Sequence, residues 1–379
     1  MVKIAILGVG SRIPASSLSS NDGALEACGS NTGNLLFQHA IKCFLGQRGA
    51  ELIYPDLLPD DISPSVINNC DLVVVPCADF LNPEYSLTGL WNRLKNCNKR
   101  CLPIGLGIGS DQPDIRRLSS ETLSVLDYFL SKSPIVCVRG QTTANALYSL
   151  GFHEDQVVVT GCFSNFLGNE NELNESYSRK LMQIEGNDSP PMAISGDRPW
   201  KESTNSLERL LYQVFRKNPN AIYLIQSHMP LVDLTRPQYS SVSTYQAIRY
   251  AVDLLEALNP FGTLKDLTSD LESRYRIWFD AEEWLEASKQ LTLSIGMRLH
   301  GNMVAMQAGV PSLWIPHDPR TTELVATMSL PFISAEQLED LDNIYSSAVE
   351  TFKQMSEPYF VRRRELASLA EAAVAECLA

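Results

Sequence analysis

Two segments near the carboxyl end of the sequence place cationic and titratable side chains directly after apolar runs. The first run, 293–296, ends in glycine and leads to Arg298 and His300. The second run, 311–315, leads to His317, Asp318 and Arg320. Because the carboxyl ends of parallel strands border the ligand crevice of an open sheet, we expect both segments to face one site.

The types of these side chains suggest group transfer from an anion. A guanidinium matches a carboxylate or phosphate with a planar fork and keeps its proton, so Arg298 is predicted to bind an anion. An imidazole exchanges protons near neutral pH, so His300 suits general acid or base catalysis beside that anion. The structural alternative is that Arg298 pairs with an acid and His300 caps the following helix.

Strands and helices must alternate along the chain to position these groups. The predicted strands are 2–7, 71–76, 101–106, 134–138 and 157–160, and then 192–195, 221–226, 275–279, 291–295 and 311–315. Amphipathic helical patterns separate them, which predicts parallel sheets covered by helices on both faces. The fold class is therefore α/β, with two Rossmann-like domains facing across a cleft and a helical C-terminal tail.

A polar interval divides the chain into two halves of the same style. We predict an N-terminal domain over 1–170, a linker over 171–190, a second domain over 191–345 and C-terminal helices over 346–379. The basic turn at 362–364 lies in the last part. It reads as a solvated helix face balanced by nearby acids, with contact to an anionic lipid-linked molecule as the alternative.

Composition excludes several classes of protein. The 379 residues include 31 Lys and Arg against 44 Asp and Glu, a formal net charge of -13, which argues against nucleic-acid binding. The nine cysteines lack tight pairing and several lie in apolar strands, which favours a reducing, cytoplasmic location. No apolar run approaches the roughly 20 residues that span a bilayer. The scattered cysteines and histidines argue against a structural zinc site.

The segment from Gly296 to Arg320 resembles the polysaccharide pyruvyl transferase family. The family pattern is Gly-x-Arg-x-His, a helix of small residues, Gly-x-Pro, an apolar strand and Asp-Pro-Lys. The chain has each part except the final lysine, which is Arg320. Arginine keeps the charge but offers no neutral amine, so Arg320 is expected to bind phosphate rather than to act as a base.

Two further segments are similar to the family. Asn31-Thr-Gly33-Asn34 opens a helix, where unpaired backbone N–H groups are expected to attract an anion; ordinary helix capping is the alternative. Arg139 follows a strand in a segment that resembles the family's Val-Arg-Asp-x-x-Ser, with Gly140 in place of the aspartate. A second departure is the turn at 76–80, where Pro-Cys-Ala-Asp-Phe replaces a glycine-rich turn.

The resemblance implies a GT-B-like fold and a pyruvyltransferase. The donor would be phosphoenolpyruvate and the acceptor a sugar of a polysaccharide or its lipid-linked precursor, which receives the pyruvyl group as a cyclic ketal. The first domain would take the acceptor and the second the donor. His300 and Arg298 are the expected catalytic residues. The expected substrate-binding residues are Arg139, Leu299, Arg320, His317, Asp318, Asn31, Gly33, Asn34, Gln226 and His228.

Other readings stay open beside this one. No cofactor is required, a divalent metal is left open, and so are a peripheral membrane contact and a homo-oligomer. Gln226 and His228 follow a strand and would serve equally as turn formers. The turn Gly8-Val-Gly10 lacks the third glycine of a dinucleotide site. The alternative functions are a GT-B nucleotide-sugar glycosyltransferase and a non-catalytic sugar- or anion-binding protein.

Overall fold

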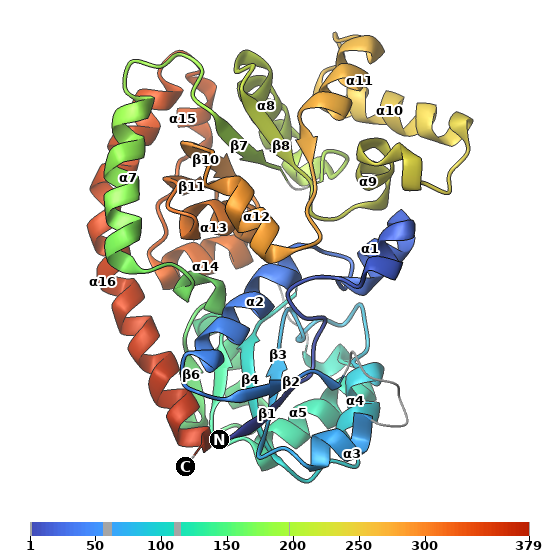
Figure 1. Ribbon diagram of the computed structural model, residues 1–379, viewed down its shortest axis with the longest axis vertical. Coiled ribbons are helices and arrows are strands. Elements are labelled where there is room, and N and C mark those ends of the chain that lie inside the picture. Colours follow the sequence, from blue (N-terminus) through green and yellow to red (C-terminus); the bar gives the residue numbers. More distant parts are fainter. Residues whose placement is uncertain (1, 56–62, 110–114, 197, 379) are drawn as a thin grey trace.

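The computed structural model describes residues 2–55, 63–109, 115–196 and 198–378, and it confirms the α/β class. Two parallel sheets lie one above the other in Figure 1. The first has the order β2-β1-β3-β4-β5-β6, and the second has the order β11-β10-β7-β8-β9. The first-sheet strands are β1 Lys3–Ile6, β2 Glu51–Ile53, β3 Leu72–Pro76, β4 Arg100–Leu106, β5 Val136–Val138 and β6 Val157–Val159. The second-sheet strands are β7 Met192–Ser195, β8 Ala221–Leu224, β9 Tyr275–Arg276, β10 Leu293–Gly296 and β11 Ser312–Trp314.

Helices connect the strands of each sheet and cover their faces. The helices that precede the crossing to the second sheet are α1 Asn21–Ala27, α2 Gly33–Gly46, α3 Ser63–Asn68, α4 Thr88–Leu94, α5 Ser120–Lys132 and α6 Gln141–Ser149. Those of the second half are α8 Asn205–Lys217, α9 Met229–Thr235, α10 Thr244–Leu258, α11 Leu264–Ser273, α12 Ala281–Ser288, α13 Leu299–Gln307, α14 Pro319–Met328 and α15 Ala335–Glu339. This alternation of strand and helix is what parallel pairing requires.

The first sheet is buried on both faces. Successive residues of β3 point to opposite sides: Val74 belongs to one apolar cluster, and Val73 and Val75 belong to another. All three are essentially inaccessible to solvent. A strand buried on both faces needs apolar residues at every position, which explains why β3 reads as a continuous valine run rather than an alternating one.

Two long helices join the halves. The predicted linker 171–190 is mostly α7, Glu170–Ile184, and the C-terminal helix α16, Ile344–Leu378, packs against α7, β11 and the first-sheet strands β4, β5 and β6. In Figure 1, α16 runs along the side of the molecule past both sheets. Its carboxyl end therefore lies with the first domain, while the exact domain boundaries stay a prediction.

The basic turn of α16 serves the structure. Arg363 is buried and donates to the carbonyl oxygens of Asn165, at 2.8 Å, and Gly168, at 2.5 Å. Arg362 pairs with Glu365 at 2.8 Å. The turn thus holds the chain where it crosses between the domains.

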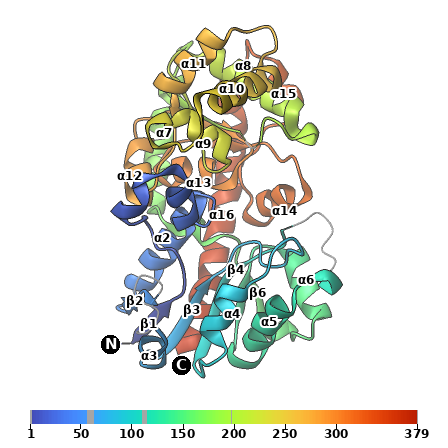
Figure 2. The ribbon, with the colours of Figure 1, turned by 90° about the vertical axis from the view of Figure 1, so that its right-hand side faces the viewer.

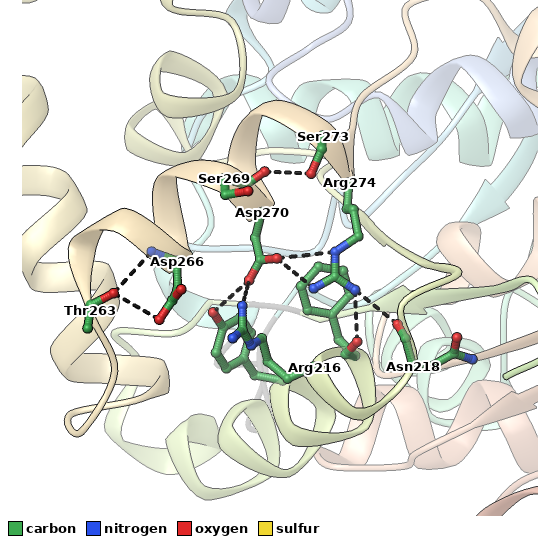
Figure 3. Close-up of polar contacts among 10 residues, drawn as sticks. Arg216, Asn218, Thr263, Asp266, Ser269, Asp270, Ser273 and Arg274 are labelled. Carbon is green, nitrogen blue, oxygen red and sulfur yellow. Dashed lines mark hydrogen bonds and ion pairs between the residues drawn. The ribbon is translucent and has the colours of Figure 1, made fainter. Parts of the chain in front are cut away.

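A buried ion-pair cluster fixes the outer edge of the second sheet. Asp270 accepts hydrogen bonds from Arg216 and Arg274, each at 2.6 Å, and Arg274 also donates to the carbonyl oxygen of Asn218 at 2.9 Å (Figure 3). These residues precede β8 and β9 in sequence, so the cluster lies at the amino ends of the strands. It therefore stabilises the amino ends of these strands, whereas the site lies at the carboxyl ends.

Candidate functional site

A pocket opens between the two domains at the carboxyl ends of the strands. It encloses about 620 Å³, part of which is open to solvent. Most of the predicted residues line it: Asn31, Asn34, Arg139, Gln226, Arg298, Leu299, His300, His317 and Arg320. Both domains contribute to this lining, which confirms that the Rossmann-like domains face each other across a cleft.

The turn that carries Arg298 and His300 is held from behind by a buried amide. Asn302 is fully buried and donates to the carbonyl oxygens of Gly296, at 2.9 Å, and Leu313, at 3.2 Å. Its own oxygen accepts from the Ser294 hydroxyl at 2.8 Å. These bonds tie β10 and β11 to the first turn of α13. They therefore fix the backbone positions from which the side chains of Arg298 and His300 extend.

His300 is enclosed by apolar and cationic groups. Its ring lies 5.7 Å from the ring of Phe37, centroid to centroid, and its Nε2 lies 3.5 Å from the Sγ of Cys162. Burial first, and then the charges of the three arginines Arg139, Arg320 and Arg298, lower the pKa of His300 from 6.5 to about 3. The imidazole is therefore neutral at physiological pH.

The arginines of the pocket come from both domains, and two of them share a carboxylate. Arg139, which is buried, donates to the Oδ1 of Asp79 at 2.9 Å. Arg320 donates to the Oδ2 of Asp79 at 2.6 Å. On the other side of the pocket, Arg298 donates to the hydroxyl of Ser227 at 2.8 Å. With three guanidinium groups and one carboxylate among the lining residues, the pocket carries an excess of positive charge.

The start of α2 is packed against the imidazole rather than open to a ligand. A Cβ placed on Gly33 would lie 2.8 Å from the Nδ1 of His300, so a glycine is needed for this approach. The expectation of unpaired backbone N–H groups here is wrong. The N–H of Gly33 donates to the side chain of Asn31, that of Asn34 to the carbonyl of Asn31, and that of Thr32 to the carbonyl of Gln226. Asn31 and Asn34 nevertheless line the pocket.

Three predicted substrate-binding residues lie outside the pocket lining. Gly33 stands behind His300. Asp318 begins α14 as its N-cap and accepts from the N–H of Thr321 at 2.6 Å. His228 precedes α9 with a φ of 81° and packs on the ring of Trp200 at 5.0 Å. Burial alone would raise the pKa of Asp318, but the bonds from Thr321 and the charges of His317 and Arg320 lower it below its usual value.

Gly140, which stands where the family pattern has an aspartate, meets Glu323 across the cleft. A Cβ placed on Gly140 would collide with the carboxyl group of Glu323, which fills the space beside this glycine. The Glu323 Oε1 accepts a hydrogen bond from the N–H of Thr142 at 2.5 Å, in the first turn of α6. A carboxylate from α14 thus caps the positive end of a helix in the other domain. Figure 2 shows α14 directly above α6.

The glycine turn after β1 is filled by the protein itself. The Oε1 of Gln38 accepts from the N–H of Gly10 at 3.0 Å, and a Cβ on Gly8 would lie 2.3 Å from the same oxygen.

Across the described parts of the chain, no group of three or more His, Cys, Asp or Glu side chains could hold a metal ion. None of the helices in those parts is long and apolar enough to cross a membrane.

Sequence reasoning missed Asp79, Ser227 and Glu323. Asp79 lies in the turn after β3, where the family pattern indicates only that a glycine-rich turn has been replaced. It does not indicate that Asp79 places a carboxylate at the end of a strand. Ser227 lies between the two residues that were singled out after β8. Glu323 follows Arg320 by one helical turn, a spacing that places both on one face of α14.

Comparison with known proteins places these features in a family. No curated protein sequence matches the chain. The solved structures that resemble it include HepE of Anabaena bound to UDP and glucose, with 13% identity over 100% of this chain and 99% of that one and a TM-score of 0.48. A putative UDP-N-acetylglucosamine 2-epimerase of Listeria monocytogenes has 11% identity over 93% and 90%, with a TM-score of 0.46. The sequence model of a family described as polysaccharide pyruvyl transferase matches residues 31–319. This match covers most of the chain, so the protein belongs to the polysaccharide pyruvyl transferase family.

Proposed function

We propose that the protein transfers the pyruvyl group of phosphoenolpyruvate to two hydroxyls of one sugar as a cyclic ketal. The observation that carries this proposal is the convergence of Arg139, Arg298 and Arg320 around a buried, neutral His300. Family membership fits the same reaction. Carboxylate and phosphate together need several cationic partners, and guanidinium forks suit both.

The reaction consumes one donor and two hydroxyl groups. A proton added to the methylene carbon turns C2 into an oxocarbenium-like centre, which the first hydroxyl attacks. Phosphate then leaves C2 and the second hydroxyl closes the ketal. Of the two hydroxyl protons, one balances the proton given to carbon and the other leaves with phosphate.

His300 is the proposed proton carrier in this scheme. Burial, and after it the arginine charges, hold its pKa low. The negative charges of a bound donor would offset those arginines and raise the pKa of the imidazole toward the range useful for transfer. The arginines would meanwhile stabilise the charge that develops on the departing phosphate, an electrostatic effect worth several kcal/mol at comparable oxyanion sites.

Calorimetric titration tests the donor. Phosphoenolpyruvate should bind the wild-type protein saturably and should not bind Arg298→Ala, while Arg249→Ala, at an exposed position of α10, should bind as the wild type does. Heat from UDP-glucose or GDP-mannose without heat from phosphoenolpyruvate would instead assign the chain to the nucleotide-sugar glycosyltransferases. Binding of phosphoenolpyruvate with no pyruvylated product on any sugar would favour a non-catalytic binding protein.

A further inference from the structure

A second cavity adjoins the pocket on the far side of the Asp79 ion pairs. It encloses about 410 Å³, part of which is open to solvent, and is lined by Asp79, Gly107, Ile108, Arg139, Thr142, Thr143, Pro319, Arg320, Glu323 and Leu324. It shares Asp79, Arg139, Arg320 and Leu324 with the first pocket. A molecule in the second cavity would therefore lie against a molecule in the first, with only these side chains between them.

The charges of this cavity favour a neutral ligand. Glu323 and Asp79 come from opposite sides of the cleft and balance the two arginines of the lining. An anion would meet both carboxylates, and a cation would meet both guanidinium groups. Hydroxyl groups can donate to carboxylate oxygens that already accept one hydrogen bond each, because each oxygen has a second lone pair.

Polar groups on both sides of the cavity suit a ligand with many hydroxyls. Thr142 is exposed and lines the cavity beside the Glu323 carboxylate, and the Asp79 carboxylate lines it as well. These groups can exchange hydrogen bonds with the hydroxyls of a ligand. Ile108 and Leu324 add an apolar wall that suits the C–H face of a saccharide ring.

We infer that this second cavity binds the sugar that accepts the pyruvyl group, which rests on the proposed function. The sugar lies with hydroxyls directed to Asp79 and Glu323, and the shared wall of Asp79, Arg139 and Arg320 brings the hydroxyl pair to the donor. The site spans both domains, since α14 supplies Glu323 and α6 supplies Thr142 and Thr143. The acceptor site is thus completed by residues of both domains.

A matched pair of substitutions on α6 tests this assignment. Thr142 and its neighbour Gln141 are both exposed in the first turn of the helix, but only Thr142 lines the cavity. Thr142→Trp fills the cavity and keeps the backbone bond to Glu323, whereas Gln141→Trp adds the same ring outside it. The probes are methyl β-D-galactopyranoside, methyl α-D-glucopyranoside and methyl α-D-mannopyranoside, titrated by ligand-observed NMR.

At least one glycoside should bind the wild type and Gln141→Trp saturably. Thr142→Trp should lower the affinity for that glycoside at least about tenfold. Arg298→Ala should keep the sugar while losing phosphoenolpyruvate. Equal sugar binding by both tryptophan variants, or no saturable binding of any of the three probes, would overturn the assignment. If phosphoenolpyruvate fails to bind the wild type while Thr142→Trp still abolishes sugar binding, the proposed reaction fails and the sugar site stands.

Discussion

Arg320 of the second domain reaches across the cleft and donates to Asp79 of the first domain over 2.6 Å. The carboxylate that pairs with it also holds Arg139 at 2.9 Å. Two of the three cations available for an anionic donor are therefore engaged by the protein's own acid. An incoming carboxylate or phosphate must compete with Asp79 for them.

Asp79→Asn should tighten the binding of phosphoenolpyruvate. The side chains of Asp79 and Arg320 are 25% and 43% exposed, so the pair is screened by solvent and its loss should lower the Kd about two- to fivefold. Calorimetry at two salt concentrations measures this, with Asp253→Asn at an exposed site of α10 as the control. An unchanged or higher Kd for Asp79→Asn would show that the carboxylate does not compete with the donor.

His300→Gln should separate binding from catalysis. Glutamine keeps a polar side chain of similar reach but cannot carry a proton, so kcat should fall about 10²- to 10⁴-fold. The Kd for phosphoenolpyruvate should change by less than about threefold, because the arginines remain. Steady-state kinetics beside calorimetry gives both quantities, and retention of full kcat would remove His300 from the mechanism.

Acid should destabilise the protein partly through His300. Its pKa is about 3 in the folded chain and 6.5 when unperturbed, so between these values only the unfolded state takes up the proton. The stability that the neutral form supports is complete above pH 6.5 and is lost as the pH falls toward 3. When the pH is lowered from about 7.5 to about 4.5, the Tm of His300→Gln should therefore fall by less than the Tm of the wild type. His153→Gln, at an exposed histidine, should follow the wild-type curve.

Gly33→Ala tests the contact between α2 and the imidazole. The new methyl group would lie 2.8 Å from the His300 Nδ1 and 2.9 Å from its Cβ, so the ring must move. We expect kcat to fall by at least about tenfold. Gly46→Ala, at the other end of the same helix, meets nothing within 4 Å and should leave kcat unchanged. Equal activity of the two variants would show that the imidazole position is not critical.

Asn302→Ala tests the support behind the catalytic turn. The change removes a buried donor to the carbonyl oxygens of Gly296 and Leu313 and the acceptor of the Ser294 hydroxyl, although Gly296 keeps the N–H of Ile315. This should lower the free energy of unfolding by about 1–3 kcal/mol. Chemical denaturation measures this. Asn92→Ala, at an exposed site of α4, should change it by less than about 0.5 kcal/mol.

The sequence was most informative where the site lies directly after a strand. Arg298, His300 and Arg139 could be predicted because parallel strands bring their carboxyl ends to one edge. Asp318 shares that position but is used as a helix cap, since its own N-cap geometry satisfies it locally. Glu323 could not be found in this way, because its role depends on how one domain rests on the other, and no local pattern encodes that contact.

The course of α16 has a consequence for synthesis of the protein. Residues of this helix cover β4, β5 and β6, yet they follow the entire second domain in the sequence. During synthesis on the ribosome, the first sheet therefore lacks part of its helical cover until the second domain and α16 have been made. The two halves should therefore complete their folding together, and the first half expressed alone should expose the apolar face that α16 covers.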